Sequence, residues 1–402
     1  MIFNKTQKNG GVFFFIVVSY IISVVSFMFS PLLGFYLSLI FLSFQIKSYS
    51  LTRLPLVMII LLSAAYIVSS REILVALGDD LQVYNVAYES IEHGGTIFYK
   101  DFSGGFEFLL MIFFWLCYHM LGIAEPASYI FVFCFLCLSL FYIWMEKFII
   151  PDITPNKRSL CLASSIGFFV IFSTSQTMRQ MLGTIFIIYA LMYYRQDMRG
   201  KFILFSLAAV FSHLTSLIII PMFLFLMSDS KTNKNIVIAI SLMVSVSFYT
   251  LLPFIISHSL LGAATYKLNY YQATSLSGSS FDSFFKLLIV MWFLSYFFYS
   301  KDMSIKCWKS LLIYGGVVYI CWMPIPLASD RLLYPLTNVL LGLVMFFCFS
   351  RITIVYRIIL PLFFIVKICS LGPGYDGGIL DGMSLWHKYE WIGFSPFYFI
   401  SL

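Results

Sequence analysis

The sequence contains few charged residues. Asp, Glu, Lys and Arg make up 11% of its 402 residues, while 61% of the residues are hydrophobic. Soluble domains usually contain about 25% charged and about 45–50% apolar residues. A water-soluble core cannot accommodate this surplus of apolar side chains, so the composition predicts an all-α protein that crosses a membrane many times.

Several motifs of soluble enzymes are also missing. The sequence has no glycine-rich nucleotide-binding motif and no Gly-x-Ser-x-Gly elbow. Its five histidines show no metal-ligand spacing with acids or cysteines, so we expect neither a metal nor another cofactor. Most of the eight cysteines lie inside apolar runs, where they act as small packing residues. The net charge of +7 comes from Lys and Arg spread over short loops, which does not indicate nucleic-acid binding.

Apolar runs indicate where the membrane helices lie. They fall near residues 12–29, 31–46, 54–70, 106–122, 127–145, 159–174, 180–194, 202–213, 214–227, 236–256, 281–299, 309–322, 332–350 and 352–369. They predict a bundle of about 11–14 membrane helices, several of them shorter than the roughly 20 residues that a straight span needs. Short or broken helices are tolerated at membrane depth only where they line protein or a wet cavity, so these runs indicate an internal site.

The charge of the connecting segments predicts the orientation of the chain. The basic segments can all face the cytoplasm, and they cover residues 47–53, 195–201, 231–234, 301–309 and 351–357. The segments that then face outward are a loop at 71–105 with a short interfacial helix, a loop at 257–280 and a C-terminal tail at 370–402. No repeat or long linker divides the chain, so we expect one integral membrane domain over residues 1–402.

This orientation leaves one conflict. An odd number of crossings must lie between residues 105 and 157, because the first is expected outside and the second inside. Two apolar runs, 106–122 and 127–145, occupy that stretch. Either one of them is re-entrant or interfacial, or the boundaries of the runs are wrong.

Two costly polar residues flank a basic hinge at 195–201. Arg179 and His213 each stand at the far end of a short apolar run, so both are expected at similar depth near the outer surface. A guanidinium offers a fork of donors that matches phosphate oxygens, and an imidazole can exchange protons near neutral pH. The simpler alternatives are an Arg179 that snorkels to the interface and a structural His213.

Further candidates lie in the predicted outer segments. Arg331 separates two apolar runs beside Asp330, which leaves a local salt bridge as an alternative. If Arg179 and Arg331 converge, they could hold a pyrophosphate. Asp80 precedes Tyr84 by one helical turn and could be a general base for a sugar hydroxyl or merely a helix cap. Glu107 opens an apolar run, where a carboxylate also suits the helix dipole.

Four short motifs follow one another between residues 78 and 335. They are Gly78, Asp80 and Tyr84 in a Gly-x-Asp-x-x-x-Tyr pattern, Arg179 followed by Gln180, the break at 211–216, and Arg331 followed by Tyr334. In order and spacing these motifs resemble the EpsG-like branch of the O-antigen and capsule polysaccharide polymerases (Wzy). The chain departs from that branch at 103–107, where a leading Glu-Pro is absent, and at 211–213, where one extra residue separates Phe from His.

The resemblance implies a GT-C-like polymerase or ligase architecture and a function. The expected reaction is an inverting, metal-independent glycosyl transfer at the periplasmic face of the bacterial inner membrane. A growing glycan on undecaprenyl pyrophosphate would move onto a lipid-linked repeat unit, and undecaprenyl pyrophosphate would leave. The expected partners are this lipid-linked oligosaccharide, membrane lipids and a chain-length regulator protein, without nucleic acid.

On this hypothesis the candidate residues take two kinds of role. The candidate catalytic residues are Asp80, His213 and Arg179, with Asp80 preferred as the base and His213 second. The candidate substrate-binding residues are Arg331, Tyr84, Gln180, Glu107 and Tyr334. The alternative functions are a flippase for lipid-linked oligosaccharides and an outer-face ligase or acyltransferase of surface polysaccharide.

Overall fold

The computed structural model describes residues 3–46, 50–71, 80–257, 284–298, 306–325, 327–371 and 390–400. Within these ranges the chain forms helices and loops without any β-strand, which confirms the predicted all-α fold. Gly78, Asp79 and almost all of the predicted loop at 257–280 lie outside the described residues.

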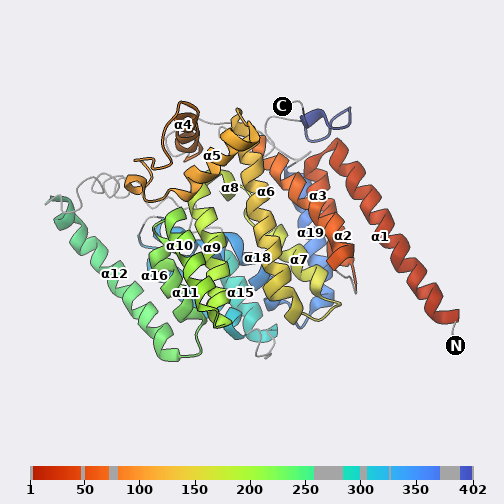
Figure 1. Ribbon diagram of the computed structural model, residues 1–402. Helices are drawn as coiled ribbons and strands as arrows, with labels where there is room; N and C mark the ends of the chain where they lie inside the picture. The colour runs from red at the N-terminus through yellow and green to blue at the C-terminus, as the bar shows by residue number, and fades with distance from the viewer. Residues whose placement is uncertain are drawn as a thin grey trace.

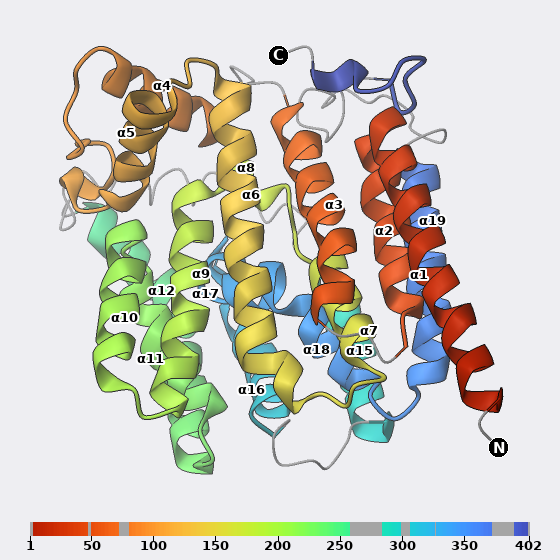
Figure 2. The same cartoon turned by 45° about the vertical axis from the view of Figure 1, so that its right-hand side comes forward.

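Most helices run side by side between two ends of the molecule (Figures 1 and 2). They are α1 (Phe3–Phe29), α2 (Pro31–Phe44), α3 (Ser50–Ser69), α6 (Pro126–Trp144), α9 (Met178–Arg195), α10 (Arg199–Ser212), α11 (Ser216–Met227), α12 (Lys231–Ser257), α15 (Phe284–Phe298), α16 (Lys306–Trp322) and α19 (Thr353–Leu371). In the described part of the chain, the helical segments long and apolar enough to span a bilayer alone are Ser50–Ser69, Pro126–Asp152 and Thr353–Leu371. The protein is a multi-pass membrane protein in which shorter apolar helices pack beside full-length ones.

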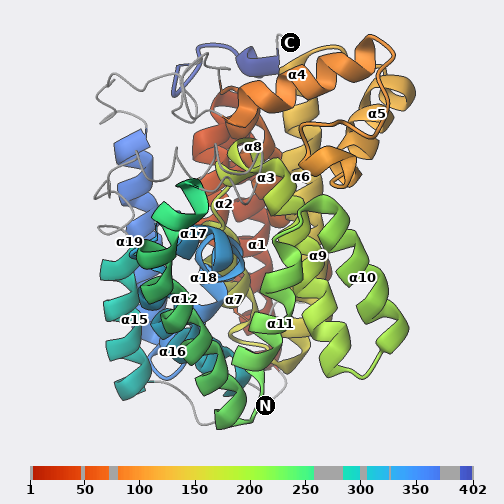
Figure 3. The ribbon, with the colours of Figure 1, turned by 90° about the vertical axis from the view of Figure 1, so that its left-hand side faces the viewer.

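The two ends of the bundle carry different groups. The turns from α9 to α10, from α11 to α12 and from α18 (Leu341–Cys348) to α19 lie at the end where α1 begins (Figure 2). These turns contain basic residues of the segments 195–201, 231–234 and 351–357, so we call this the basic end. The opposite end, here the α4 end, carries α4 (Asp80–Glu92), α5 (Leu109–Leu121) and residues 390–400 (Figures 1 and 3).

The C-terminal residues 390–400 are tied to the end of α1. The backbone N–H of Gly393 donates to the carbonyl of Phe29 at 3.0 Å, and that of Phe397 donates to the carbonyl of Met28 at 2.7 Å. The described part of the predicted tail therefore lies at the α4 end. The short helix predicted within the loop at 71–105 is present as α4.

The position of α5 resolves the conflict over crossings. This helix packs on α4 at the α4 end, while α6 alone continues to the basic end (Figure 2). Its 13 residues span only about 20 Å, too short for a bilayer core. Gly122, with a φ of 65°, then ends the helix in a left-handed cap. Of the two apolar runs between residues 105 and 157, the first therefore forms a helix that stays at the α4 end, and the second, as α6, joins the two ends of the bundle.

The run predicted at 159–174 is a broken helix. It forms α7 (Arg158–Gly167) and the single turn α8 (Ser173–Gln176). Between them, hydroxyl groups bond to nearby carbonyls: Thr174 Oγ1 donates to Ile171 O at 2.6 Å, and Ser175 Oγ donates to Phe172 O at 2.9 Å. Such local bonds compete with the helical ladder, so this run is one of the broken helices that the sequence predicts.

The run predicted at 332–350 is broken as well, and the two breaks meet. It forms α17 (Ala328–Leu332), the π-helical turn η5 (Pro335–Val339) and α18. The carbonyl of Asn338 accepts from the N–H of Val170 at 2.9 Å, and its side-chain oxygen accepts from Ser173 Oγ at 2.9 Å. Each broken segment thus satisfies polar groups of the other, which is the condition for irregular backbone at membrane depth.

A glycine lets these two segments approach. The Ser164 hydroxyl on α7 donates to the carbonyl of Gly342 on α18 at 2.6 Å. A Cβ atom added at Gly342 would lie 2.1 Å from the Ser164 carbonyl oxygen. Small residues allow this kind of backbone contact between membrane helices.

Replacing Gly342 by Val should lower the Tm of the purified protein in detergent. The new side chain would collide with backbone atoms of α7, and overpacking of this kind costs about 1–3 kcal/mol. Gly200→Ala is the control, because a Cβ there meets nothing within 4 Å and helical Ala is favourable. Its Tm should be unchanged or slightly higher. An unchanged Tm for Gly342→Val would contradict the close crossing of α7 and α18.

Candidate functional site

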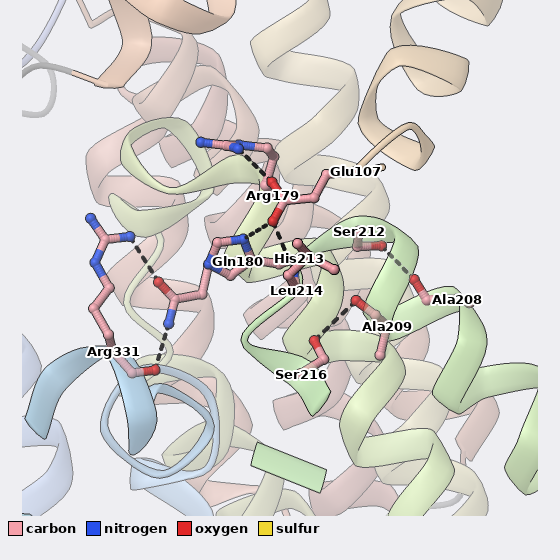
Figure 4. A network of polar contacts seen from close by, with 10 residues as sticks. All are labelled: Glu107, Arg179, Gln180, Ala208, Ala209, Ser212, His213, Leu214, Ser216 and Arg331. Atoms are coloured by element: carbon pink, nitrogen blue, oxygen red, sulfur yellow. Dashed lines mark hydrogen bonds and ion pairs between the residues drawn. The ribbon is translucent and has the colours of Figure 1, made fainter. Parts of the chain in front are cut away.

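The residues that the sequence marks as candidates come together at the α4 end of the bundle. They derive from five places in the chain: α4, the loop before α5, the start of α9, the turn between α10 and α11, and the segment from α17 to η5. Figure 4 shows the polar network that joins most of them. Residues as far apart in sequence as Asp80 and Tyr334 therefore share one site.

Glu107 is the centre of this network. Its side chain is only 1% exposed. One carboxylate oxygen accepts from the guanidinium of Arg179. The other accepts from the backbone N–H of Leu214 at 2.8 Å and lies 2.9 Å from Nδ1 of His213 (Figure 4). These donors satisfy both oxygens of the buried carboxylate.

Arg179 lies in the first turn of α9, which begins after the hydroxyl-rich break. Its guanidinium stands over the ring of Phe102 at 4.3 Å from the ring centre and over that of Tyr84 at 5.9 Å. Aromatic faces and a carboxylate together hold the cation in place while 20% of its side chain stays exposed. Arg179 is therefore fixed within the protein, which contradicts the alternative of snorkelling to the interface.

His213 lies where the helical chain breaks between α10 and α11. The sequence predicted that break, and the structure confirms it. His213 is extended, with φ −159° and ψ 121°. The hydroxyls of Ser212 and Ser216 donate to the carbonyls of Ala208 and Ala209, at 2.8 and 3.0 Å. The break frees the N–H of Leu214 for Glu107 and turns the imidazole toward the same carboxylate.

Gln180 connects this half of the site to Arg331. Its side-chain amide donates to the carbonyl of Arg331 at 2.7 Å and accepts from the Arg331 guanidinium at 2.9 Å. Successive residues of a helix point about 100° apart, so Arg179 and Gln180 face different neighbours from one turn of α9. The first turn of α9 therefore carries Arg179 and, through the next residue Gln180, binds Arg331 (Figure 4).

Asp80 and Tyr84 approach from α4, one helical turn apart as predicted. A carboxylate oxygen of Asp80 lies 3.6 Å from the Arg331 guanidinium, and the two side chains are 38% and 37% exposed. Tyr84 is buried, and the guanidinium of Arg179 stands over its ring. Burial raises the pKa of the Tyr84 phenol, so it remains a neutral donor at neutral pH.

A cavity of about 400 Å³ opens beside Arg331. The hydroxyl groups of Tyr334 and Thr177 hydrogen-bond at 2.6 Å on its wall. Its lining combines polar and apolar residues, which are Asp330, Arg331, Thr177, Tyr334, Thr337, Asn338, Val170, Leu287 and Leu341. The site thus joins charged groups to a pocket that can accept an amphipathic molecule.

Comparison with known proteins identifies the family. The model of the EpsG family matches residues 72–371, which is more than half of the chain and includes the whole site. This chain belongs to the EpsG family. Its members resemble Wzy-type polymerases, so the coarse function is that of a membrane polysaccharide polymerase with glycosyltransferase-like chemistry. No curated protein and no solved structure matches the chain.

The partner of Arg331 in this EpsG-family protein differs from the simplest expectation. The alternative of a local salt bridge between Arg331 and Asp330 was wrong. Asp330 accepts from the hydroxyl of Tyr319 at 3.0 Å, while Arg331 faces Asp80. Sequence reasoning also missed Phe102 and the N–H of Leu214. An aromatic residue in an outer loop and a backbone group carry no signal that separates them from their neighbours.

The contacts of Glu107 set its charge. The residue lies in the loop before α5, outside the spanning helices. Burial alone would raise its pKa, but the hydrogen bond and charge of His213, the charge of Arg179 and the N–H of Leu214 outweigh burial and lower the pKa to about 2.

In the described part of the chain, no three His, Cys, Asp or Glu side chains gather to hold a metal ion.

Glu107→Gln should lower the Tm at pH 7, because removing one partner of a buried ion pair costs about 3–5 kcal/mol. A carboxyl with a lowered pKa stabilises the fold above its ordinary value of 4.5, and this contribution is lost as the pH falls toward 2. The Tm difference between wild type and Glu107→Gln should therefore narrow between pH 5 and pH 3. Glu125→Gln, at an exposed position, is the control and should change little at any pH. A difference that widens on acidification would contradict the proposed ion pairs.

Proposed function

We propose that this protein is an O-antigen polymerase. It transfers the growing undecaprenyl-pyrophosphate-linked glycan en bloc onto a lipid-linked repeat unit and releases undecaprenyl pyrophosphate. The observation that carries the proposal is the presence of two partly exposed guanidiniums at one end of a membrane bundle: Arg179, and Arg331, which is bound by Gln180, the residue after Arg179.

Two guanidiniums suit a diphosphate better than a single cation does. Each offers a planar fork of donors, and a diphosphate presents oxygens on two phosphorus atoms. The carboxylates of Glu107 and Asp80 keep the site near neutrality before substrate binds. Since the Asp80–Arg331 contact is 3.6 Å long and about a third exposed, an incoming phosphate can replace Asp80 as the partner of Arg331.

The orientation supports a reaction on the outer face. Basic segments gather at the end opposite the site, and such segments face the cytoplasm in bacterial membranes. We therefore infer that the basic end faces the cytoplasm of a bacterial inner membrane and that the α4 end faces the periplasm. Lipid-linked repeat units carry their sugars on that side in this proposal.

The chemistry is a direct displacement at the anomeric carbon of the donor. A hydroxyl of the acceptor sugar attacks this carbon, a new C–O bond forms, and the bond to the pyrophosphate oxygen breaks. The electron pair of the broken bond stays on the pyrophosphate, where Arg179 and Arg331 stabilise the charge. The hydroxyl proton passes to a base, and both Asp80 and His213 are candidates. Such a displacement inverts the anomeric configuration and needs no metal in principle.

The remaining candidates would position sugars and lipid. Tyr84 and Tyr334 present phenol groups near the arginines, and Gln180 orients Arg331. The cavity beside Arg331 is lined by both polar and apolar residues, which suits a phosphate attached to a polyprenyl chain.

The polymerase is preferred over a flippase because of where the charged groups lie. A transporter needs polar groups along a path through the membrane. In the described residues the Glu107–Arg179–His213 and Asp80–Arg331 contacts gather at the α4 end, while Arg53 and Glu146 pair with each other away from it. An outer-face ligase or acyltransferase would use the same phosphate groups but a different acceptor, which the test below distinguishes.

Arg179→Ala should convert long polysaccharide into single-repeat lipopolysaccharide while the protein still inserts. Loss of one preorganised charge-stabilising donor typically lowers kcat by about 10²- to 10³-fold. Arg199→Ala is the matched control, because this arginine is 87% exposed at the basic end. The readout is the ladder on a gel, with membrane-inserted protein measured in parallel. Unchanged ladders for Arg179→Ala would reject its role.

The decisive experiment is polymerisation by the purified protein from purified lipid-linked repeat units. Products longer than one repeat, with release of undecaprenyl pyrophosphate, are expected for wild type and for Arg199→Ala. Arg331→Lys keeps the charge but loses the fork, so its rate should fall between those of wild type and Arg331→Ala. Transfer of single units to another acceptor without chain growth would overturn the polymerase in favour of a ligase.

A further inference from the structure

Polymerisation leaves open which group takes the proton of the acceptor hydroxyl. Asp80 is half-exposed and faces Arg331, so a bound phosphate would compete with it for that cation. His213 has a different environment, because its Nδ1 lies 2.9 Å from a carboxylate that is itself held by other donors. The two candidates can therefore be separated by their surroundings.

The carboxylate of Glu107 has no capacity left to act on a substrate. Arg179 occupies one oxygen, and the N–H of Leu214 and Nδ1 of His213 occupy the other. Since the side chain is 1% exposed, a sugar hydroxyl cannot reach it without breaking these bonds. The residue acts on the reaction through its two side-chain partners.

An ionised Glu107 specifies the protonation of the imidazole. A carboxylate only accepts hydrogen bonds, so Nδ1 of His213 must carry a hydrogen to bond with it. In the neutral ring the hydrogen then sits on Nδ1, and the lone pair is on Nε2. Nε2 has no hydrogen-bond partner in the described part of the chain, and 17% of the side chain is exposed. In Figure 4 the ring extends from Glu107 toward the side where Gln180 and Arg331 lie.

We propose that Glu107 is the positioning residue that makes His213 the proton acceptor and, through the same carboxylate, holds Arg179 against the leaving pyrophosphate. The proposal rests on the polymerase function above. The acceptor O–H proton passes to Nε2 while the new C–O bond forms, and the imidazolium is stabilised by Glu107 until it returns the proton to water. One side chain thereby sets the distance between the base and a phosphate-binding cation.

Charged and titratable groups surround His213 from several segments of the chain. Glu107 faces it from the loop before α5, and Arg179 approaches from α9 on the other side of that carboxylate. Tyr84 and Asp80 on α4 and Arg331 on α17 lie beyond Arg179. The adjoining turns of α10 and α11 contribute the hydroxyls of Ser212, Thr215 and Ser216. Glu107 is thus the negative group in direct contact with the ring.

The test is the pH dependence of kcat for polymerisation of lipid-linked repeat units by the purified, full-length protein. Glu107→Gln should lower kcat by about 10²-fold or more, within the range of acid–base catalysis. At acidic pH kcat falls as the base becomes protonated, and we call this fall the acidic limb of the profile. Glu107→Gln should also move the acidic limb to lower pH, because the imidazolium loses its negative neighbour. Glu107→Asp keeps the charge with a shorter reach, so its kcat should fall less and its limb should stay near that of wild type.

Two further variants separate the candidates for the base. His213→Ala should abolish the acidic limb, and Asp80→Asn should retain it while raising KM through Arg331. The opposite pattern, with the limb lost in Asp80→Asn and kept in His213→Ala, would overturn the proposal. So would a Glu107→Gln enzyme with the kcat and profile of wild type.

The experiment distinguishes a failure of the proposed polymerase function from a failure of the proposed role of Glu107. A wild-type protein that forms no polymer from lipid-linked repeat units would overturn the proposed function, and this inference with it. An active wild type with unaltered Glu107 variants would overturn only the inference. If Glu107→Gln cannot be recovered folded, the comparison of Glu107→Asp with His213→Ala decides the matter, since an acidic limb that persists in His213→Ala rejects the assignment.

Discussion

A buried carboxylate with three donors holds the site together. Glu107 comes from the loop that precedes α5, whereas Arg179 and His213 come from two breaks in the helical bundle. Burying an ionised carboxylate is very unfavourable unless hydrogen bonds and opposite charge compensate for lost hydration. Because the compensation requires all three segments at once, the contact fixes the layer of α4 and α5 onto the end of the bundle. The same requirement brings a cation and an imidazole to opposite sides of one side chain.

The first turn of α9 divides the site into two functional halves. Arg179 turns toward Glu107 and His213, while Gln180 turns toward Arg331 and, through it, toward Asp80. In the proposed mechanism one half provides the proton acceptor and the other a partly exposed cation beside a cavity of mixed polarity. A glycosyl transfer from a lipid diphosphate needs both functions within the length of a sugar ring. A helix start satisfies that need because adjacent side chains diverge from nearly the same point.

The broken helices near the site are tolerated at membrane depth because they satisfy each other's polar groups. The break between α7 and α8 and the break from α17 to η5 expose backbone groups that lipid could not satisfy. Asn338 accepts from both Val170 and Ser173, so the two breaks complete each other. The close contact between α7 and α18 at Gly342 also holds these two segments together. Arg331 and Tyr334 lie in the segment just before Asn338, so the site lies where the helices are irregular.

The membrane class, the all-α fold, the break at 211–216 and the polar candidate residues could all be predicted from the amino-acid sequence. Composition, run length and the conformational preferences of Ser, Thr and His are local properties, and a single chain displays them. The sequence did not determine that the run at 106–122 lies beside α4, where the runs at 159–174 and 332–350 break, or that Arg331 faces Asp80 rather than Asp330. Those outcomes depend on which helix faces meet, because a buried charge selects its partner by proximity in space. Only the tertiary structure brings residues so distant in the chain within hydrogen-bonding distance.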